Sequence, residues 1–306
     1  MDSADTNMRN PPNENTPNEN PPNGDSVDPP TPWLKYLVDS IQSRPVVPHA
    51  KMPVERTAVY YNMNHKKRGI AIILNHEHFR ANLNLRSRSG TNLDSKKLEN
   101  TLQGLGFDPW SYYDRSLEEV HQIIAKASTL DHSDHDALIV VVLTHGEQGI
   151  LYANDGVYKP DSLWLPFTAD KCKSLAGKPK LFFIQACQGD KLDSGVIMRP
   201  TETDSGTGSY KIPIHADFLI AYSTIPGYYS WRNTSKGSWF MQALCEELNE
   251  NGFLLDLLTI MTFVNQRVAF DFESNTPDNP GMHQQKQIPC ITYMLTRLVK
   301  FTRKQN

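Results

Sequence analysis

One histidine and one cysteine in this sequence could form a catalytic pair, because each follows a run of apolar residues. Residues 137–144 (ALIVVVLT) lead into His145, and residues 180–186 (KLFFIQA) lead into Cys187. A free thiol has a pKa of about 8.5 and is mostly protonated at neutral pH, so it needs a nearby base to become an attacking thiolate. An imidazole can take that proton and later give it to a leaving amine. The pair therefore predicts nucleophilic catalysis by cysteine.

The backbone beside this pair could stabilise the oxyanion that forms from a reacting carbonyl group. Gly146 follows the histidine directly and has no side chain, so its N–H group can face a carbonyl oxygen. The N–H group of Cys187 would be the second donor of such an oxyanion hole. Two simpler interpretations stay open at this point. A cysteine after an apolar strand is more often a buried core thiol, and a histidine at a strand end is often only a hydrogen-bonded polar group.

Short apolar runs predict the strands that would position these residues. Besides the two runs that end at the pair, such runs occupy residues 68–75, 218–223 and 288–294. Short, continuous apolar runs are typical of strands that are buried on both faces. Residues 150–158 alternate around Asp155-Gly156 instead and predict a hairpin.

Helical patterns lie between these strands. Leucines at helical spacing begin near Asn92 and end before Gly106, a suitable C-terminal cap, and Ser116 with Glu119 begins a capping box. Two further helices are predicted over residues 239–248 and 255–272. The alternation predicts an α/β fold with a mainly parallel central sheet and helices on both faces. In such a sheet, sites form outside the carboxyl ends of the strands, where the histidine and the cysteine lie.

Composition argues against several classes of function. The chain has 306 residues, 39% of them hydrophobic, with a formal net charge of -3 and a sequence pI near 6.4. This charge gives no indication of nucleic-acid or membrane binding, and no apolar run reaches the roughly 20 residues that span a bilayer. The four cysteines are widely spaced, without a C-x-x-C pair, which favours free thiols in a reducing, cytoplasmic compartment. They are Cys172, Cys187, Cys245 and Cys290.

Two segments differ from this globular pattern. Residues 10–32 are rich in Asn and Pro, so we expect a disordered segment, followed by apolar residues at helical spacing between Trp33 and Ile41. Residues 191–211 consist mainly of Gly, Ser, Thr and Pro with scattered charges. Such a segment is too long for an ordinary loop in a compact domain, which predicts a functional or cleavable connection.

The sequence around the cysteine resembles that of a known protease family. Gln185-Ala186-Cys187-Gln188-Gly189 matches the signature of the caspases, which have a histidine upstream. Other segments resemble the family in the same order over residues 58–301, and such collinear agreement is far more specific than one motif. They are Ser87-Arg88-Ser89-Gly90-Thr91, Thr144-His145-Gly146-Glu147, Tyr222-Ser223-Thr224, residues 226–233 (PGYYSWRN), Gly237-Ser238-Trp239-Phe240 and Lys286-Gln287-Ile288-Pro289-Cys290. The chain resembles an effector, or executioner, caspase, and looks most like the insect members.

The resemblance implies a role for each matching residue. Cys187 would be the nucleophile, His145 the acid–base group, and the Arg86 carbonyl group would orient the histidine. Arg88, Gln185 and Arg232 would surround an aspartate at P1, since guanidinium groups offer a carboxylate charge-assisted, bidentate hydrogen bonds. The rest of the groove would be formed by Tyr229, Ser230, Trp231, Asn233 and Trp239. Trp239 favours a DExD-type recognition sequence, while residues 275–282 differ from the loop that lines P4 in mammalian effector enzymes.

The resemblance also implies how the chain is organised and activated. It implies a zymogen with a disordered prodomain at residues 1–56, a large subunit at 57–204 and a small subunit at 205–306, joined by the cleavable linker 191–211. The last strand would run antiparallel to the rest of the sheet. Cleavage between subunits is expected after Asp204, and removal of the prodomain after Asp5, Asp25 or Asp28.

The implied assembly is a homodimer of large–small heterodimers that executes apoptosis without a metal or organic cofactor. Its partners would be protein substrates cut after Asp, an upstream initiator protease and inhibitor-of-apoptosis proteins, with no nucleic acid and no membrane. A catalytically silent relative that only binds active caspases has no chemical need for the cysteine, the histidine and both arginines together. Residues 131–136 (DHSDHD) resemble metal ligands but lack a defined ligand spacing, so we interpret them as a solvated loop.

Overall fold

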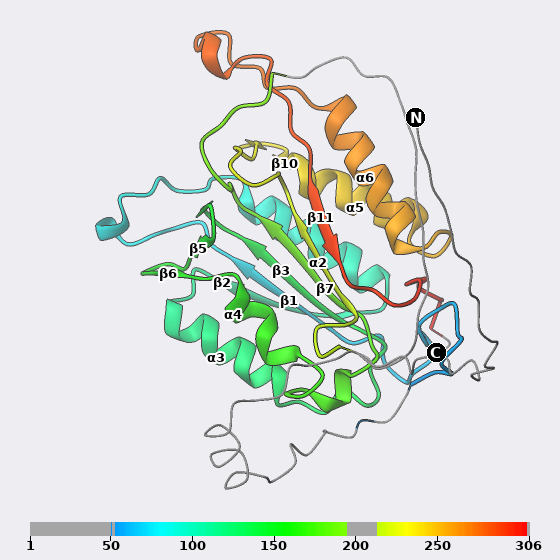
Figure 1. The fold of residues 1–306 in the computed structure, drawn as a ribbon. Helices are drawn as coiled ribbons and strands as arrows, with labels where there is room; N and C mark the ends of the chain where they lie inside the picture. The colour runs from blue at the N-terminus through cyan, green and yellow to red at the C-terminus, as the bar shows by residue number, and fades with distance from the viewer. Residues whose placement is uncertain (1–49, 51–52, 195–212, 305–306) are drawn as a thin grey trace, which may run out of the picture. The chain divides into compact units, whose positions relative to one another are not determined.

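The centre of the fold is a six-stranded sheet with the order β11-β8-β7-β3-β1-β2, seen in the computed structural model (Figure 1). The structure describes residue 50 and residues 53–194 and 213–304. Neighbouring strands pair in parallel from β2 to β8, and β11 runs antiparallel to β8. The strands are β1 (Ile70–Asn75), β2 (Asp108–Tyr113), β3 (Leu138–Leu143), β7 (Lys180–Gln185), β8 (Phe218–Tyr222) and β11 (Cys290–Tyr293). The predicted sheet, with its antiparallel last strand, is confirmed.

Helices cover both faces of this sheet. On one face lie α2 (Thr91–Gly104), α5 (Trp239–Asn251) and α6 (Leu257–Asp271); on the other lie α3 (Leu117–Ser128) and α4 (Asp161–Trp164) (Figure 1). Successive side chains of a strand point to opposite faces, so the continuous apolar runs supply both cores. In β1, for example, Ile73 packs with the first group of helices and Ile72 with the second. Burial of each such side chain stabilises the fold by about 1.5–3 kcal/mol.

Local signals in the sequence set the ends of two helices. The capping box at α3 is present, because the Glu119 N–H group donates to Ser116 Oγ (3.3 Å) and the Ser116 N–H group donates to Glu119 Oε2 (2.9 Å). Gly106 has a φ of 90° just after α2, in the left-handed region that terminates helices. Both termini agree with the sequence-based prediction.

The predicted hairpin is part of a small antiparallel sheet that begins next to His145. β5 (Ile150–Tyr152) pairs with β6 (Val157–Tyr158) on one side and with β4 (Gly146–Glu147) on the other. A second small sheet consists of β9 (Arg232–Asn233) and β10 (Gly237–Ser238). Short 3-10 helices complete the described elements: η1 (Ala81–Leu83), η2 (Leu165–Phe167), η3 (Lys173–Leu175) and η4 (Pro280–Met282).

The sequence patterns did not predict β2. β2 contains Pro109 and is half-exposed. The edge of a sheet tolerates proline because the missing N–H donor there faces outward.

The interpretation of residues 131–136 as a solvated loop was wrong in part. His132 and His135 are buried: their Nδ1 atoms lie 2.9 Å apart, and His132 Nε2 lies 2.8 Å from the Ala127 carbonyl oxygen. Asp136 is also buried, paired with Arg68 at 2.8 Å. Within the described residues, no group of acidic, His and Cys side chains could hold a metal ion.

Several predictions concern residues that the structure does not describe. These are the disordered segment, the apolar spacing between Trp33 and Ile41, and the cleavage sites at Asp5, Asp25, Asp28 and Asp204. The linker 191–211 is described only up to residue 194. Among the described helices, none is long and apolar enough to cross a bilayer.

Candidate active site

Two neighbouring strands place Cys187 and His145 at the same edge of the sheet. Leu143 at the end of β3 pairs with Gln185 at the end of β7, and the Thr144 N–H group donates to the Gln185 carbonyl oxygen at 3.0 Å. Each member of the pair lies two residues beyond its strand end. The register of β3 and β7 therefore brings the two side chains to the same level outside the carboxyl ends of the strands, as the sequence predicted.

Gly146 lies directly against the backbone of the cysteine. A Cβ atom at residue 146 would be 2.7 Å from the Cys187 carbonyl oxygen and 2.9 Å from the Ala186 Cβ atom. Both approaches are too close for carbon, so this position accepts only glycine. The N–H groups of Gly146 and Cys187 consequently belong to backbone segments in contact, which the predicted oxyanion hole requires.

His145 is oriented by the main-chain oxygen that the sequence resemblance indicated. Its Nε2 atom lies 2.7 Å from the Arg86 carbonyl oxygen, which can only accept, so Nε2 carries the hydrogen and Nδ1 keeps a lone pair. The Phe79 ring packs beside the imidazole with 5.0 Å between ring centroids. Burial, together with the charges of Arg88 and Arg232, lowers the pKa of His145 to about 4. At neutral pH the imidazole is therefore a free base.

Cys187 carries a partly accessible thiol that is held by a backbone group. The Ser230 N–H group donates to Cys187 Sγ at 3.4 Å. Burial raises the pKa of this thiol, and the Ser230 N–H group and the charges of Arg88 and Arg232 oppose the shift. The resting pair is therefore a neutral thiol beside a neutral imidazole, so the thiolate forms as the proton moves to the base.

Two guanidinium groups lie close to this thiol. Arg88 is 1% exposed, and its Nη1 donates to the His76 carbonyl oxygen (3.0 Å) and to Thr91 Oγ1 (2.7 Å). Arg232 Nε donates to the Ser89 carbonyl oxygen at 3.1 Å. Burial and the neighbouring charge of Arg232 lower the pKa of Arg88 to about 9.

These two cations have no ion-pair partner in the part of the chain that the structure describes. Two neighbouring, desolvated guanidinium groups repel each other, and together they attract an anion. The arrangement is therefore suited to one bound carboxylate beside the thiol.

Gln185 and Ser230 form one chain of hydrogen bonds at the floor of the site. Gln185 Nε2 donates to Ser230 Oγ at 2.7 Å, and Ser230 Oγ donates to Ser223 Oγ at 2.8 Å. Ser223 Oγ donates in turn to the Ala186 carbonyl oxygen at 3.0 Å, next to the cysteine. The chain fixes the Gln185 amide, and one of its two N–H hydrogens remains for a ligand.

A row of aromatic rings extends from the thiol along the predicted groove. Tyr229 meets Trp231 edge to face at 5.2 Å, Trp231 stacks on Trp239 at 5.6 Å, and Trp239 stacks on Phe272 at 5.5 Å. Asn233 lies on β9 next to Arg232, where its Oδ1 atom accepts the Ser235 N–H group at 2.9 Å. The sequence predicted the first three rings. Phe272 was expected only as the end of a helix, because a single aromatic residue there gives no functional signal.

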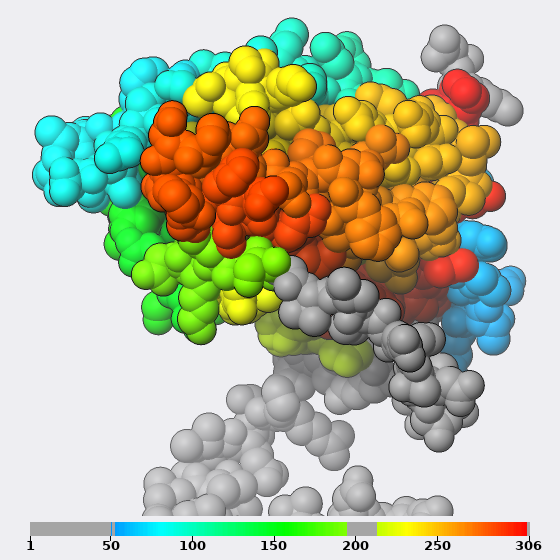
Figure 2. Space-filling view, turned by 90° about the horizontal axis from the view of Figure 1, so that it is seen from above, coloured from blue at the N-terminus to red at the C-terminus, as the bar shows by residue number. Residues whose placement is uncertain are grey.

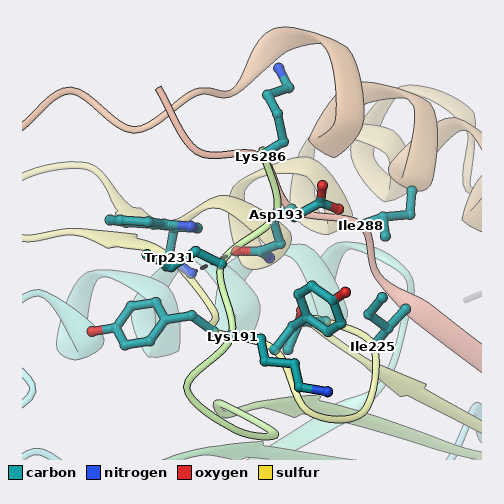
Figure 3. A pocket seen from close by; sticks show the side chains of 11 residues that line it. Lys191, Asp193, Ile225, Trp231, Lys286 and Ile288 are labelled. Atoms are coloured by element: carbon teal, nitrogen blue, oxygen red, sulfur yellow. Dashed lines mark hydrogen bonds between the residues drawn. The ribbon is translucent and has the colours of Figure 1, made fainter. Parts of the chain in front are cut away.

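A narrow hollow without room for a water molecule lies behind Tyr229 and Trp231 (Figure 3). Trp231 bounds it on one side and Ile225 and Ile288 on the other, and the Trp231 N–H group donates to Gln287 Oε1 at 2.6 Å. The segment that follows Cys187 also lines it: the Tyr229 N–H group donates to the Lys191 carbonyl oxygen at 2.8 Å. The hollow therefore belongs to the support of the aromatic row and contains neither the thiol nor the arginines.

Comparisons with known proteins agree with this geometry. The family model described as "Caspase domain" matches residues 68–300. The chain is 62% identical to Caspase-1 of Spodoptera frugiperda (84% of this chain, 86% of that protein) and 59% identical to Caspase drICE of Drosophila melanogaster (84% and 76%). The crystal structure of the Spodoptera caspase-1 superimposes with a TM-score of 0.79 at 60% identity, covering 85% of this chain and 99% of that one. Caspase-3 of Oryctolagus cuniculus is 44% identical over 79% of this chain and 86% of its own. The chain belongs to the caspase family of cysteine peptidases, which cleave proteins after aspartate, and within that family to the effector caspases.

Proposed function

We propose that Cys187 is the nucleophile and His145 the acid–base group with which this effector caspase cleaves its substrates. The single observation that carries the assignment is the placement of Cys187 and His145 at the same edge of the sheet, with two guanidinium groups near the thiol that have no ion-pair partner among the described residues. The other described cysteines are placed differently: Cys172 and Cys245 are buried, and Cys290 lies in β11, where it pairs with Tyr222 of β8.

In the proposed mechanism, His145 takes the Cys187 proton on its free Nδ1 atom as the sulfur attacks the carbonyl carbon after aspartate. The N–H groups of Gly146 and Cys187 hold the oxyanion of the tetrahedral intermediate. The C–N bond then breaks, and His145 gives its proton to the leaving amine. Water attacks the thioester with His145 as base, which releases the acid and restores the thiol.

The P1 pocket is formed in this proposal by Arg88, Gln185 and Arg232. Aspartate at P1 neutralises the repulsion between the arginines and receives hydrogen bonds from both forks and from the Gln185 amide. Asparagine brings no charge and places its own donors against these donors, so it leaves buried charges uncompensated. Glutamate is one methylene longer and meets the donors out of alignment, so the pocket rejects both residues.

Residues along the aromatic row select the positions before P1. Tyr229 and Trp231 form the floor for P2, the backbone of Arg232 holds P3, and Asn233 with Trp239 shapes P4. Ser230 is a further residue of this substrate-binding surface. These assignments are supported by the packing of the aromatic rings: Tyr229 packs on Trp231, and Trp231 packs on Trp239. The three rings form a continuous apolar surface beside the arginines. We infer a DExD-type preference, with residues 275–282 as a loop whose contribution at P4 differs from that of mammalian effector enzymes.

The chain is proposed to be a zymogen that is activated by cleavage after Asp204. The products are a large subunit, residues 57–204, and a small subunit, residues 205–306, after loss of the prodomain 1–56 at Asp5, Asp25 or Asp28. The pairing of β7 with β8 supports this division, since it joins the two subunits through the central sheet after the linker 191–211 is cut. Folding therefore survives the cut.

The active assembly is proposed to be a homodimer of these heterodimers in the cytoplasm. Strand β11 supports the dimer because it is the edge of the sheet, and it leaves Tyr293 53% exposed and Met294, just beyond it, 37% exposed. An exposed apolar edge strand is a template for pairing with another chain. The upstream partner is an initiator protease, and inhibitor-of-apoptosis proteins would bind the active form.

The proposed function is tested with purified protein, a Cys187→Ala variant and two fluorogenic peptides that differ only in Asp or Asn at P1. The expected result is turnover of the Asp peptide by the wild type, no turnover of the Asn peptide, and no activity in the variant. Equal cleavage of both peptides would refute the pocket assignment, and residual activity in the variant would refute the nucleophile.

A further inference from the structure

The P1 pocket, called the P1 socket below, is assembled from two parts of the chain. These parts are the start of helix α2 and the β9–β10 hairpin, and we call the buried contact between them the joint. Arg88 lies just before helix α2, whereas Arg232 lies on β9 of the β9–β10 hairpin. In the proposed cleavage scheme these arginines belong to different subunits. The hairpin must therefore be held against α2 if both guanidinium groups are to meet one carboxylate. Figure 2 shows the yellow segment that contains this hairpin directly against the cyan and teal segment that contains the start of α2.

Asp94, in the first turn of α2, is at the centre of this joint. Its side chain is fully buried and receives every N–H and O–H that Ser238 can offer. The Ser238 N–H group is shared by both carboxylate oxygens (2.9 and 3.1 Å), and Ser238 Oγ donates to Oδ2 at 2.6 Å. Ser238 is the residue that pairs with Arg232 across the hairpin. One carboxylate of α2 thus holds the residue opposite a socket arginine.

Glycines allow the two parts to approach this closely. A Cβ atom at Gly237 would collide with Asp94 Oδ1. A Cβ atom at Gly90 would lie 2.7 Å from the Thr234 carbonyl oxygen, and Gly90 has a φ of 92°, which disfavours any side chain. Arg232 itself closes the joint through its hydrogen bond to the Ser89 carbonyl oxygen. The β9–β10 hairpin and the start of helix α2 are therefore in close contact at several points.

Asp94 also acts on both arginines through its charge without filling the socket. Its carboxylate favours the charged form of Arg88 and of Arg232, yet within the described ranges no ion pair joins it to either. The hydrogen bonds from Ser238 engage both of its oxygens and hold them at the hairpin. The carboxylate thus compensates part of the positive charge of the two arginines. Because it does not bind their guanidinium groups, these groups remain available for a ligand.

We propose that Asp94 is a positioning residue for P1 recognition, which fixes the hairpin carrying Arg232 at the spacing from Arg88 that one aspartate carboxylate can bridge. The inference rests on the proposed function, since it assigns Arg88 and Arg232 to the P1 pocket. It goes further by naming the contact that keeps the two subunits in register at that pocket.

The test measures KM and kcat for the peptide with Asp at P1 in Asp94→Ala, Asp94→Asn and Gly90→Ala. Loss of a hydrogen-bonded buried carboxylate displaces the hairpin, so Asp94→Ala should raise KM about tenfold or more while kcat changes by less than about threefold. Asp94→Asn keeps an acceptor for the Ser238 N–H group and should recover most of the affinity. Gly90→Ala separates the same two segments by steric pressure and should raise KM as well.

Asp256→Ala is the matched control for a loss of stability alone. Asp256 caps helix α6 by accepting the Leu258 and Thr259 N–H groups (3.0 and 3.3 Å), a comparable role distant in sequence from the socket. This variant should lower the unfolding temperature and leave KM unchanged. A KM within about twofold of the wild type in Asp94→Ala, or an equal rise of KM in Asp256→Ala, would overturn the inference.

The two proposals fail in different ways. A wild-type enzyme that cleaves the Asp and Asn peptides equally would overturn the proposed pocket and this inference with it. A wild-type enzyme that selects Asp, beside an Asp94→Ala variant that selects and binds it equally well, would overturn only the role of Asp94.

Discussion

Burying two guanidinium groups side by side is costly, because each charge loses hydration and the two repel each other. Arg88 is 1% exposed, and the neighbouring Arg232 adds to the effect of burial in lowering its pKa to about 9. A carboxylate that enters between them removes the repulsion and supplies the missing acceptors. The same two residues that destabilise the empty site would therefore, in the proposed pocket, give the enzyme its requirement for an acidic side chain.

Replacement of Arg232 tests this argument at the level of a single side chain. Arg232→Ala removes a charged hydrogen-bond donor from the bound P1 carboxylate, so kcat/KM for the Asp peptide should fall about 100-fold. The unfolding temperature should change little, because the side chain has one described hydrogen bond and lies beside a like charge. Arg267→Ala, which removes an arginine from a surface network with Glu246, Glu247 and Glu250, is the control and should leave kcat/KM unchanged. A large loss of stability with unchanged Asp preference would assign Arg232 a structural role instead.

The protonation state of His145 is the second test at this scale. Burial lowers its pKa to about 4, so the ring should stay neutral from pH 8 down to about 5 and become protonated only as the pH approaches 4. Histidine ring resonances in a Cys187→Ala protein, recorded by NMR against pH, measure this directly. A His145 signal that titrates with a midpoint near the usual value of 6.5 would contradict the lowering of this pKa by burial.

The strands β3 and β7 determine the geometry of the catalytic pair. Because Leu143 pairs with Gln185, two residues of turn on each strand are enough to bring His145 and Cys187 to one level. Gly146 then begins β4 and lets the two turns touch. A register shift of one residue between β3 and β7 would move the side chains of one strand to the opposite face of the sheet and would separate His145 from Cys187.

Gly146→Ala tests the contact between these turns. The added Cβ atom would lie 2.7 Å from the Cys187 carbonyl oxygen, so it should push apart the two N–H groups of the oxyanion hole. Loss of one such donor costs about 100- to 1,000-fold in kcat, and KM should change far less. Gly104→Ala, in helix α2 with nothing within 4 Å of the new atom, is the control and should keep full activity. A Gly146→Ala enzyme with normal kcat would exclude this backbone from the oxyanion hole.

Sequence patterns predicted the parts of the fold whose signals are local. The continuous apolar runs of β1, β3 and β7, the Ser116 capping box and the order of the elements all follow from neighbouring residues. Residue roles in the site needed the family resemblance, because an isolated arginine such as Arg88 looks like a surface residue.

Long-range contacts gave no local signal. The pairing of Asp94 with Ser238 joins residues 144 positions apart, and an acidic residue in the first turn of a helix is ordinarily explained by the helix dipole. The burial of His132 and His135 likewise depends on their contact with each other and on the Ala127 carbonyl oxygen. Pattern reasoning treated these residues as a solvated loop because nothing adjacent in sequence covers them.

At the scale of the whole molecule, the two proposed subunits contribute adjacent parts of one sheet. Strands β1, β2, β3 and β7 come from residues before Asp204, and β8 and β11 come from residues after it. The β7–β8 pairing is parallel and continuous over five residue pairs, so a cut in the linker leaves the core intact. We therefore expect the proposed cleavage to leave the core of the molecule folded.

The proposed cleavage site is tested by the intact mass of purified protein. Active wild-type enzyme should consist of two chains that meet between Asp204 and Ser205, whereas Asp204→Ala should stay a single chain across this junction. Cys187→Ala, which cannot cut itself, should also remain uncut when made alone and should be cut at Asp204 when active enzyme is added. Subunits that meet at another residue would refute this site.

The most direct measurement of the central claim is covalent labelling with a peptide that ends in aspartate followed by an electrophilic carbon. The account predicts one label per active site, attached to Cys187 Sγ, and no label from the asparagine analogue or in an Arg232→Ala, Arg88→Ala double variant at the same concentration. Labelling of Cys172, Cys245 or Cys290 in place of Cys187, or equal labelling by the asparagine peptide, would contradict it.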